Sequence, residues 1–183
     1  YRLTEHHTAG GMSRTVSYLA ELQPEMFCEV SPALAAERGL EHGGWATLVT
    51  ARAAIEARVL VTDRLRPLRV MGRDVHQIGV PYHWGRRGIV TGDPGNELTS
   101  LVLDFNVHIA EYKALTCDIV PGRRPRGRAL EAFVAGYRRR AGAGGAPRGP
   151  FRDSGWPTGR QELRWPDTIR SWTEGAQGCN GSR

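Results

Sequence analysis

The chain has 183 residues, with 25 basic and 19 acidic side chains and a formal net charge of +6. This length suits one domain with a hydrophobic core and excludes a large multidomain enzyme. No apolar run approaches the roughly 18 residues of a membrane-spanning helix, so direct membrane insertion is not expected. The three cysteines are far apart, which argues against a disulfide framework or a CxxC metal site.

The positive charge is confined to the C-terminal third. Residues 1–120 carry 12 basic and 14 acidic side chains, whereas residues 121–183 carry 13 and 5. A general nucleic-acid interface is therefore not expected, although an Arg-rich RNA-binding tail is an alternative hypothesis. The basic side chains are 24 Arg and one Lys, so Lys113 is an exception to the strong preference of this chain for arginine.

The first 62 residues predict short elements. Residues 1–14 are rich in Gly, His and Thr and indicate a short strand leading into a loop, followed by a short apolar run over 16–22. Residues 27–30 predict a strand. A helix then starts at Ser31 as N-cap and Pro32 at its first position, and Gly39 ends it.

Beyond a Gly43-Gly44 turn, residues 45–50 and 55–62 have the β-branched, alternating pattern of half-buried strands. Two short strands around Gly72 are expected within 68–80, then a long ordered loop over 80–100 and a closing strand over 114–120. The predicted fold is mainly β, a barrel of short strands with short helices, rather than a layered α/β sheet.

Three regions are predicted: a β-barrel domain over 1–120, a basic helical extension over 121–142, and a Gly/Pro/Arg-rich tail over 143–183. The tail contains too little periodic apolar sequence to offset its ordering entropy and is expected to be disordered. Its Trp156, Trp165 and Trp172 leave open docking on a partner or a non-native extension. The chain starts at Tyr1 without a leader, so a fragment is expected, and periplasmic and cytoplasmic locations stay open.

Five motifs in one order, with a Gly-Leu-x-x-Gly turn at 39–43 between the second and third, carry a family resemblance over about residues 1–140: YRLTEHHTAGGMSR, FCEVSP, VPYHWG, GNELTS and HIAEYKALTCDI. Together they resemble the final domain of the alpha subunit of formate dehydrogenases, within the molybdenum or tungsten bis-molybdopterin oxidoreductases. The resemblance implies a six-stranded double-psi β-barrel whose loops cover one side of two pterin guanine dinucleotides. Asp104-Phe105-Asn106 departs from the family's Asp-Pro-Asn, so the turn geometry of that proline is not carried over.

The implied cofactor is bis-molybdopterin guanine dinucleotide, with molybdenum or tungsten. The residues expected to contact it are Thr4, Glu5, His6, His7, Thr8, Gly10, Gly11, Met12, Ser13, Arg14, His83, Trp84, Gly85, Asn96, Leu98, Thr99, Tyr112 and Lys113.

The chemistry of these motifs supports that expectation without requiring it. The block Thr4–Arg14 combines hydroxyls, glycines that permit close approach, and ring and guanidinium donors, which suit a pyrophosphate. An ordinary Gly-rich turn is the alternative. Adjacent His6 and His7 suggest a metal, but no spaced third ligand accompanies them, so no metal site is expected.

The later motifs also have plainer interpretations. Trp84 would suit a hydrophobic core, and Asn96 follows Gly95 as turn-forming asparagines do. Lys113 either supplies a point charge to the cofactor or is a solvated surface residue. If it contacts the cofactor, Lys113→Ala in the intact enzyme should lower cofactor retention more than Arg69→Ala or Arg73→Ala.

No catalytic residue is expected in this chain. The resemblance places the metal-ligating Cys or selenocysteine, its His and Arg, and the 4Fe-4S cluster in a missing N-terminal part. Cys28 and Cys117 instead fall in apolar strands, so the isolated chain is expected not to oxidise formate. Expected partners are the remaining domains of the catalytic subunit and an iron–sulfur electron-transfer subunit. A stand-alone double-psi barrel acting as a binding module is the alternative.

Overall fold

A computed structural model describes residues 1–100, 103–104, 106–110 and 115–142, all within one compact unit, Tyr1–Gly144. The expectations for Tyr112, Lys113 and the tail over 143–183 lie outside the described residues.

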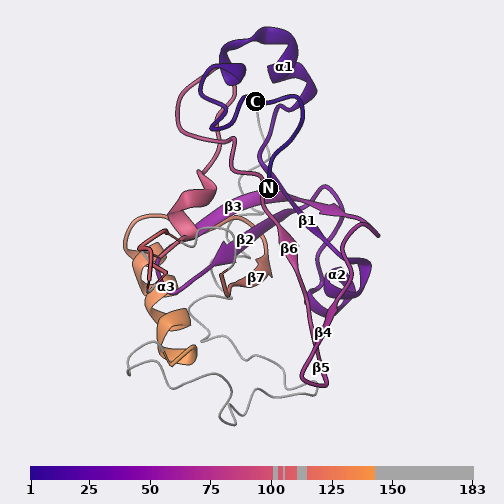
Figure 1. The fold of residues 1–183 in the computed structure, drawn as a ribbon, viewed down its shortest axis with the longest axis vertical. Coiled ribbons are helices and arrows are strands. Elements are labelled where there is room, and N and C mark those ends of the chain that lie inside the picture. The colour runs from indigo at the N-terminus through magenta and orange to yellow at the C-terminus, as the bar shows by residue number, and fades with distance from the viewer. Residues whose placement is uncertain (101–102, 105, 111–114, 143–183) are drawn as a thin grey trace, which may run out of the picture. The chain divides into compact units, whose positions relative to one another are not determined.

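The centre of this unit is a curled five-stranded sheet with the order β6-β1-β3-β2-β7 (Figure 1). The strands are β1 (Phe27–Val30), β2 (Trp45–Val49), β3 (Ala54–Val61), β6 (Ile78–Gly79) and β7 (Asp118–Pro121). β1 runs parallel to β3, and the other neighbours are antiparallel. The chain is therefore mainly β with few helices. Among the described residues the order ends at β6 and β7, so closure into a six-stranded barrel stays a prediction.

The main hydrophobic core lies against the inner strands. Leu48 in β2 and Ile55 in β3 are fully buried, and Ile119 of β7 packs with them. Nearly every residue of β2 and the first half of β3 is buried. Each such aliphatic side chain contributes about 1.5–3 kcal/mol when removed from water. The predicted strands over 45–50 and 55–62 are confirmed within a residue of their ends.

Helix α2 (Pro32–Arg38) follows β1 as the capping pattern predicts. The main-chain N–H of Leu34 donates to Ser31 Oγ at 3.1 Å, and Pro32 occupies the first helical position. Gly39 ends the helix with a φ of 64°, a left-handed conformation that glycine adopts without strain. Leu34 is buried in the main core, so the helix covers one face of the sheet.

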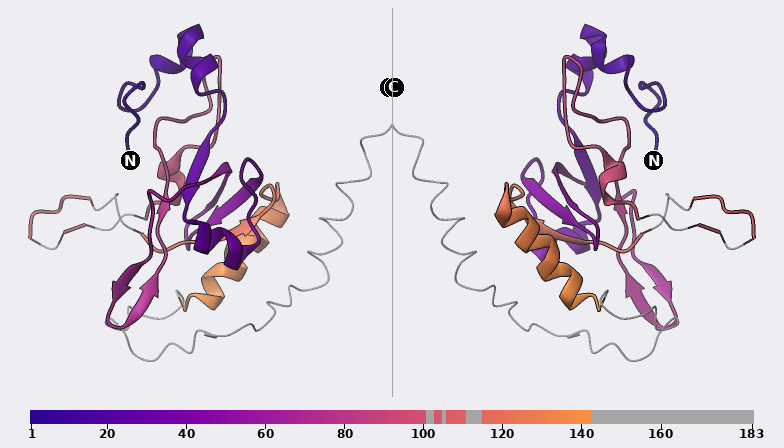
Figure 2. Two further views of the ribbon diagram at one scale, coloured as in Figure 1. Left: turned by 90° about the vertical axis from the view of Figure 1, so that its right-hand side faces the viewer. Right: turned by 90° about the vertical axis from the view of Figure 1, so that its left-hand side faces the viewer.

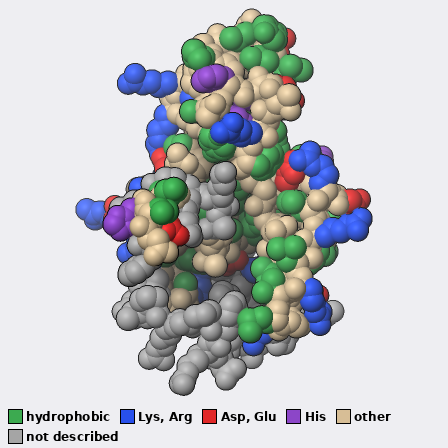
Figure 3. Space-filling view, viewed as in Figure 1, with side chains coloured by type: hydrophobic (Ala, Val, Ile, Leu, Met, Phe, Trp, Pro, Cys, Tyr) green, Lys and Arg blue, Asp and Glu red, His purple; other side chains and the backbone are tan. Residues whose placement is uncertain are grey.

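Strands β4 (Leu68–Val70) and β5 (Arg73–Val75) form the hairpin predicted around Gly72. Met71 and Gly72 have φ values of 48° and 78°, the left-handed conformations that a two-residue hairpin turn requires. The hairpin projects from the sheet (Figure 2), and all its strand residues are exposed. On the face shown in Figure 3, hydrophobic and Arg side chains lie next to each other along it.

The predicted N-terminal strand is wrong. Residues 1–12 form turns, followed by a 3-10 helix η1 (Ser13–Thr15) and the helix α1 (Ser17–Leu22), which accounts for the apolar run at 16–22. The turns close on themselves: Gly10 N–H donates to His7 O, and Arg14 N–H donates to Gly10 O at 3.0 Å. These groups are consequently unavailable for a sheet partner.

The closing strand is shorter and later than predicted. β7 begins at Asp118 because its partner β2 ends at Val49, which pairs with Asp118. After β7, the helix α3 (Arg128–Arg140) packs Val134 and Tyr137 against Val49 and Ala54 at the β2–β3 turn. None of the helices in the described part of the chain is long and apolar enough to cross a membrane.

Candidate functional site

The N-terminal block (residues 1–14) and the 81–85 loop are held together by His83. Its side chain is fully buried. Leu3 N–H donates to His83 Nε2 at 2.7 Å, and His83 Nδ1 hydrogen-bonds to the carbonyl oxygen of Thr8. Because a main-chain N–H can only donate, Nε2 is the unprotonated nitrogen and Nδ1 carries the proton. Burial lowers the pKa of His83, in agreement with a neutral ring.

Arg14 crosses the same junction from η1. Its Nη1 donates to the carbonyl oxygens of His83 and, at 3.0 Å, of Ala9, while Nε donates to Arg87 O at 3.1 Å. The residue is buried, and this burial lowers the guanidinium pKa. Three main-chain carbonyl oxygens therefore accept hydrogen bonds from Arg14, whose guanidinium the sequence analysis had assigned to a cofactor phosphate.

Gly10 is where the two segments approach most closely. A Cβ at this position would overlap the carbonyl oxygen of His83 and lie 2.8 Å from Arg14 Nη1. The φ of Gly10 is also +71°, a conformation that disfavours other residues. Gly11 has open space on its Cβ side, so only the first glycine of the pair is required by the packing.

Two buried ring nitrogens near this junction have no hydrogen-bond partner among the described residues. His6 is 7% exposed and its Nδ1 lies 2.9 Å from Ser13 Oγ, but its Nε2 is unpartnered. Trp84 is 3% exposed and its Nε1 is unpartnered. The two ring centroids are 6.2 Å apart. Burial lowers the pKa of His6, and Ser13 Oγ donates to Gly10 O at 3.4 Å, so Nδ1 donates to Ser13 and the unpartnered pair comprises an acceptor, His6 Nε2, and a donor, Trp84 Nε1.

The rest of the N-terminal block is exposed. The predicted cofactor residues that it presents to solvent are Thr4, Glu5, His7, Thr8, Gly11 and Met12. The predicted block thus divides into a buried frame and an exposed set that a ligand can reach. Periodicity could not separate them, because the chain there has no regular element.

The GNELTS motif, residues 95–100, lies beside the 81–85 loop. It forms the 3-10 helix η2 (Gly95–Leu98), where a Cβ at Gly95 would lie 3.5–3.8 Å from atoms of Val80, Pro81 and Tyr82. Asn96 is exposed and its carbonyl oxygen accepts from Thr99 Oγ1 at 2.9 Å. Leu98 is buried in the main core. The structure therefore brings three of the predicted motifs next to one another.

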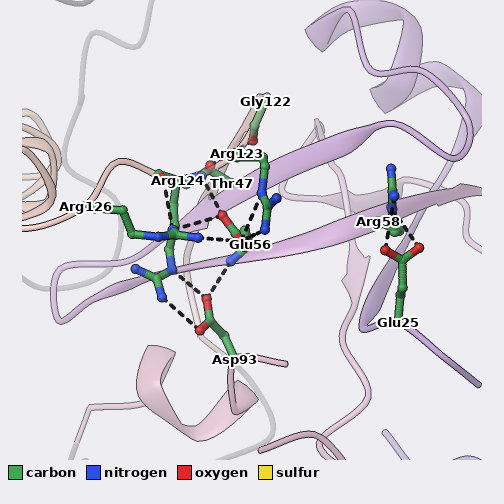
Figure 4. Close-up of polar contacts among 9 residues, drawn as sticks. All are labelled: Glu25, Thr47, Glu56, Arg58, Asp93, Gly122, Arg123, Arg124 and Arg126. Carbon is green, nitrogen blue, oxygen red and sulfur yellow. Dashed lines mark hydrogen bonds and ion pairs between the residues drawn. The ribbon is translucent and has the colours of Figure 1, made fainter. Parts of the chain in front are cut away.

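A charged cluster that the sequence did not identify lies on the sheet next to η2 (Figure 4). Glu56 of β3 is 8% exposed and accepts from Arg123 Nη2 at 2.7 Å and Arg126 Nη2 at 2.8 Å. Asp93 accepts from Arg124 Nε at 2.6 Å and from the main-chain N–H of Glu56 at 3.1 Å. We call these five residues the arginine lock.

The neighbouring arginines determine the pKa of Glu56 in the arginine lock. Burial alone would raise the pKa of Glu56, but hydrogen bonds from Arg126 and Arg123 outweigh it and lower the pKa to about 2. Arg123 also lies over the Trp45 ring at 4.3 Å, and Arg58 lies over the same ring at 4.2 Å. The run Gly-Arg-Arg-Pro-Arg-Gly was the only sequence signal, and its buried acidic partner is 67–70 residues away.

The two thiols in the described residues have no features of metal ligands. Cys28 is buried, and burial raises its pKa to about 12; burial likewise raises the pKa of Cys117 to about 11. Within residues 1–100, 103–104, 106–110 and 115–142, no group of three His, Cys, Asp or Glu residues is arranged to hold a metal ion.

Comparison with known proteins gives one family match and several relatives. The family model described as "Molydopterin dinucleotide binding domain" matches residues 1–116. The chain is 38% identical over 123 residues to "Formate dehydrogenase subunit alpha" of Megalodesulfovibrio gigas. It is 41% identical over 120 residues to "Formate dehydrogenase, nitrate-inducible, major subunit" of Escherichia coli. The resemblance inferred from the five motifs is confirmed.

These relatives are much longer than the chain. Each of the two alignments covers 65% of this chain but only 12% of the relative. A third relative, "Formate dehydrogenase 2 subunit alpha (cytochrome c-553)" of Nitratidesulfovibrio vulgaris, shows the same coverage at 40% identity. The matched region therefore corresponds to a small part of each relative.

Proposed function

We propose that this chain, which belongs to the molydopterin dinucleotide binding domain family, binds a molybdopterin guanine dinucleotide cofactor within a formate dehydrogenase-like oxidoreductase. The observation that carries the proposal is the division of the N-terminal block. Buried His83 and Arg14 hold its shape, and its exposed hydroxyl and glycine residues remain accessible. A frame set before binding reduces the ordering cost of capturing a ligand.

The residues present fit such a cofactor. A pyrophosphate needs hydroxyl and main-chain N–H donors, which Thr4, Thr8 and the open side of Gly11 offer. The edges of a pterin or guanine carry both donors and acceptors. Trp84 Nε1 and His6 Nε2 are a donor and an acceptor that lack partners among the described residues. A buried polar atom without a partner costs about 1–3 kcal/mol, so a ligand group that satisfies it would gain affinity.

In the intact enzyme, this domain would close over the dinucleotides, orient them and exclude water. When bound, the cofactor supplies the molybdenum or tungsten centre at which the substrate is oxidised. The chain's own residues bind and position it. The exposed residues of the block and the unpartnered nitrogens of His6 and Trp84 contact the cofactor, and buried His83 and Arg14 keep the block in place. Tyr112 and Lys113 belong to this proposal as further contacts. The 4Fe-4S cluster and an iron–sulfur partner subunit belong to the rest of the assembly.

The parallel pairing of β1 with β3 in an otherwise antiparallel sheet supports a double-psi β-barrel as the complete fold. Closure to six strands would require a pairing beyond those in the described residues. A structure of the intact catalytic subunit would test this part of the proposal. A sheet that stays open there would contradict it.

The experiment removes one donor and keeps an aromatic ring in the core, at the cost of some core volume. In the complete subunit, Trp84→Phe removes Nε1–H and keeps an aromatic side chain in the core. Loss of one hydrogen bond to the cofactor, about 1 kcal/mol, should weaken retention about fivefold. Guanine nucleotide and metal content per mole of purified subunit would measure it.

Tyr82→Phe is the matched control on the same loop. It removes a hydroxyl that accepts from Arg2 Nε at 2.6 Å in an exposed position. Equal cofactor content in the Trp84 and Tyr82 variants would overturn the role of Trp84. Full retention after Thr4→Val and Thr8→Val as well would remove the cofactor site from the N-terminal block.

A further inference from the structure

The imidazole of His83 has both nitrogens engaged with the main chain of the N-terminal block. Nε2 accepts from Leu3 N–H at 2.7 Å, and Nδ1–H donates to Thr8 O. The two block residues bracket the segment 4–7, which contains Thr4, His6 and His7. One ring thus fixes both ends of a six-residue turn that is otherwise exposed on most of its surface.

The direction of each hydrogen bond makes this arrangement specific to one protonation state. A doubly protonated imidazolium has two N–H donors and no acceptor. Its Nε2–H would face the N–H of Leu3, so two donors would oppose each other at hydrogen-bonding distance. Protonation therefore breaks the Leu3 contact while the Thr8 contact can persist.

Burial, and after it the neighbouring titratable groups, disfavours protonation of His83 and lowers its pKa. The His6 ring stacks on the His83 ring at a centroid distance of 5.4 Å, and the Tyr82 ring stacks on the His83 ring at 5.1 Å. His6 and the amino group of Tyr1 act against a positive charge on His83, and together with burial they outweigh the hydrogen bonds to the main chain of Thr8 and His7, which favour it. The Arg14 guanidinium donates to the carbonyl oxygen of His83. No carboxylate in the described residues hydrogen-bonds to His83.

We infer that His83 is a positioning residue, a neutral clasp that holds residues 3–8 in their cofactor-binding conformation and releases the Leu3 end on acidification. This inference rests on the proposed function for the purpose of the turn, but the clasp itself concerns only the chain. His83 is thus removed from the set of direct cofactor contacts, because both its ring nitrogens are already engaged.

The first test uses the 183-residue chain without cofactor. Side-chain ¹⁵N chemical shifts at pH 7.5 should show His83 protonated at Nδ1 and bare at Nε2. The Leu3 amide, corrected for intrinsic exchange, should lose at least tenfold of its protection from hydrogen exchange between pH 7.5 and pH 5. A ring protonated at Nε2, or unchanged Leu3 protection, would overturn the clasp.

Variants separate titration from packing. The side-chain oxygen of His83→Gln can replace Nε2 as acceptor but cannot titrate, so Leu3 protection should become independent of pH. His83→Asn keeps a donor near the Nδ1 position, and should lose Leu3 protection at every pH. His42→Gln is the matched control, because His42 Nδ1 also accepts a main-chain N–H, from Val61 at 3.3 Å, on an exposed surface. If Leu3 still opens with acid in His83→Gln, His83 is not the responsible group.

The second test asks whether the clasp serves the cofactor. In the complete subunit, cofactor retained after gel filtration should fall from pH 7.5 to pH 5.5 in wild type and His42→Gln, and should fall less in His83→Gln. The isolated chain could show the expected pH-dependent protection of Leu3 while the wild-type, His42→Gln and His83→Gln subunits lose cofactor identically with pH. That result would contradict the positioning role. Loss of cofactor binding in Thr4 and Thr8 variants decides the proposed function separately.

Discussion

Two regions attach distant segments to the same sheet by opposite chemistry. At the N-terminal block, His83 and Arg14 bind main-chain groups, and the buried imidazoles are neutral. At the arginine lock, three guanidinium groups surround the carboxylates of Glu56 and Asp93. The first region depends on tautomer and close packing and the second on charge. They should therefore respond differently to mutation, pH and salt.

The arginine lock should show the largest effect of a single substitution. Glu56→Gln keeps the shape of the side chain but removes the charge that Arg123 and Arg126 share. Because Glu56 is buried and the arginines are over half exposed, we expect a loss of about 2–4 kcal/mol in the free energy of unfolding. Urea denaturation with a shared m value would measure it.

Glu25→Gln is the control for this substitution. Glu25 pairs with Arg58 in two hydrogen bonds, but its side chain is 47% exposed, so a loss of under about 1 kcal/mol is expected. Similar losses in the two variants would show that burial of Glu56 adds nothing to the lock.

A glycine substitution tests the N-terminal block. Gly10→Ala places a methyl group against the carbonyl oxygen of His83 and forces alanine into a left-handed conformation. The substitution should therefore lower the free energy needed to open the block by about 1–3 kcal/mol. Tryptic cleavage at Arg2 and Arg14 should accelerate in proportion. Gly11→Ala, which meets open space, should cleave at the wild-type rate, and equal acceleration in both would refute the close-approach argument.

Acid should act on the two regions in separate pH ranges. The pKa values of His6 and His83 are lowered, so the unfolded chain binds protons that the folded chain does not, and stability falls as pH drops below about 6.5. The pKa of Glu56 is lowered from 4.5 to about 2, so its contribution is present above pH 4.5 and is lost as pH falls towards 2.

Unfolding free energies from pH 8 to 2 would resolve the two ranges. His83→Gln should reduce the decline below pH 6.5 and leave the lower range unchanged. Glu56→Gln should do the reverse. A single decline that both variants shift together would show that the regions are not independent.

Salt should produce the smallest difference. Raising NaCl from 0.05 to 0.5 M should reduce the penalty of Glu56→Gln by under about 1 kcal/mol, because Arg123 and Arg126 are partly exposed to screening ions. The penalty of Gly10→Ala should stay constant, since steric overlap is not screened. A salt-dependent penalty at Gly10 would indicate that Arg14 acts there through its charge.

Elements with local causes could be predicted from the sequence. The Ser31 cap, Pro32 and Gly39 define α2 within a few residues, and Gly72 marks the division between the two hairpin strands, because each cause lies inside its element. The strands over 27–30, 45–50 and 55–62 follow from side-chain alternation. The five motifs were sufficient to identify the family, which the match over residues 1–116 confirms.

Only the tertiary structure decided which residues of a motif are accessible. The sequence placed His83 and Arg14 among the cofactor contacts, but in the structure both are buried and bonded to main-chain groups, most of which are 69–80 residues away. Turns replaced the predicted N-terminal strand because the main chain of Leu3 and Thr8 bonds to the buried His83 ring, and Gly10 and Arg14 bond within the block. Glu56 looked like an ordinary polar position of a strand until β7 brought Arg123 and Arg126 across it. Pairing between such distant positions depends on how the sheet curls, which local sequence patterns do not encode.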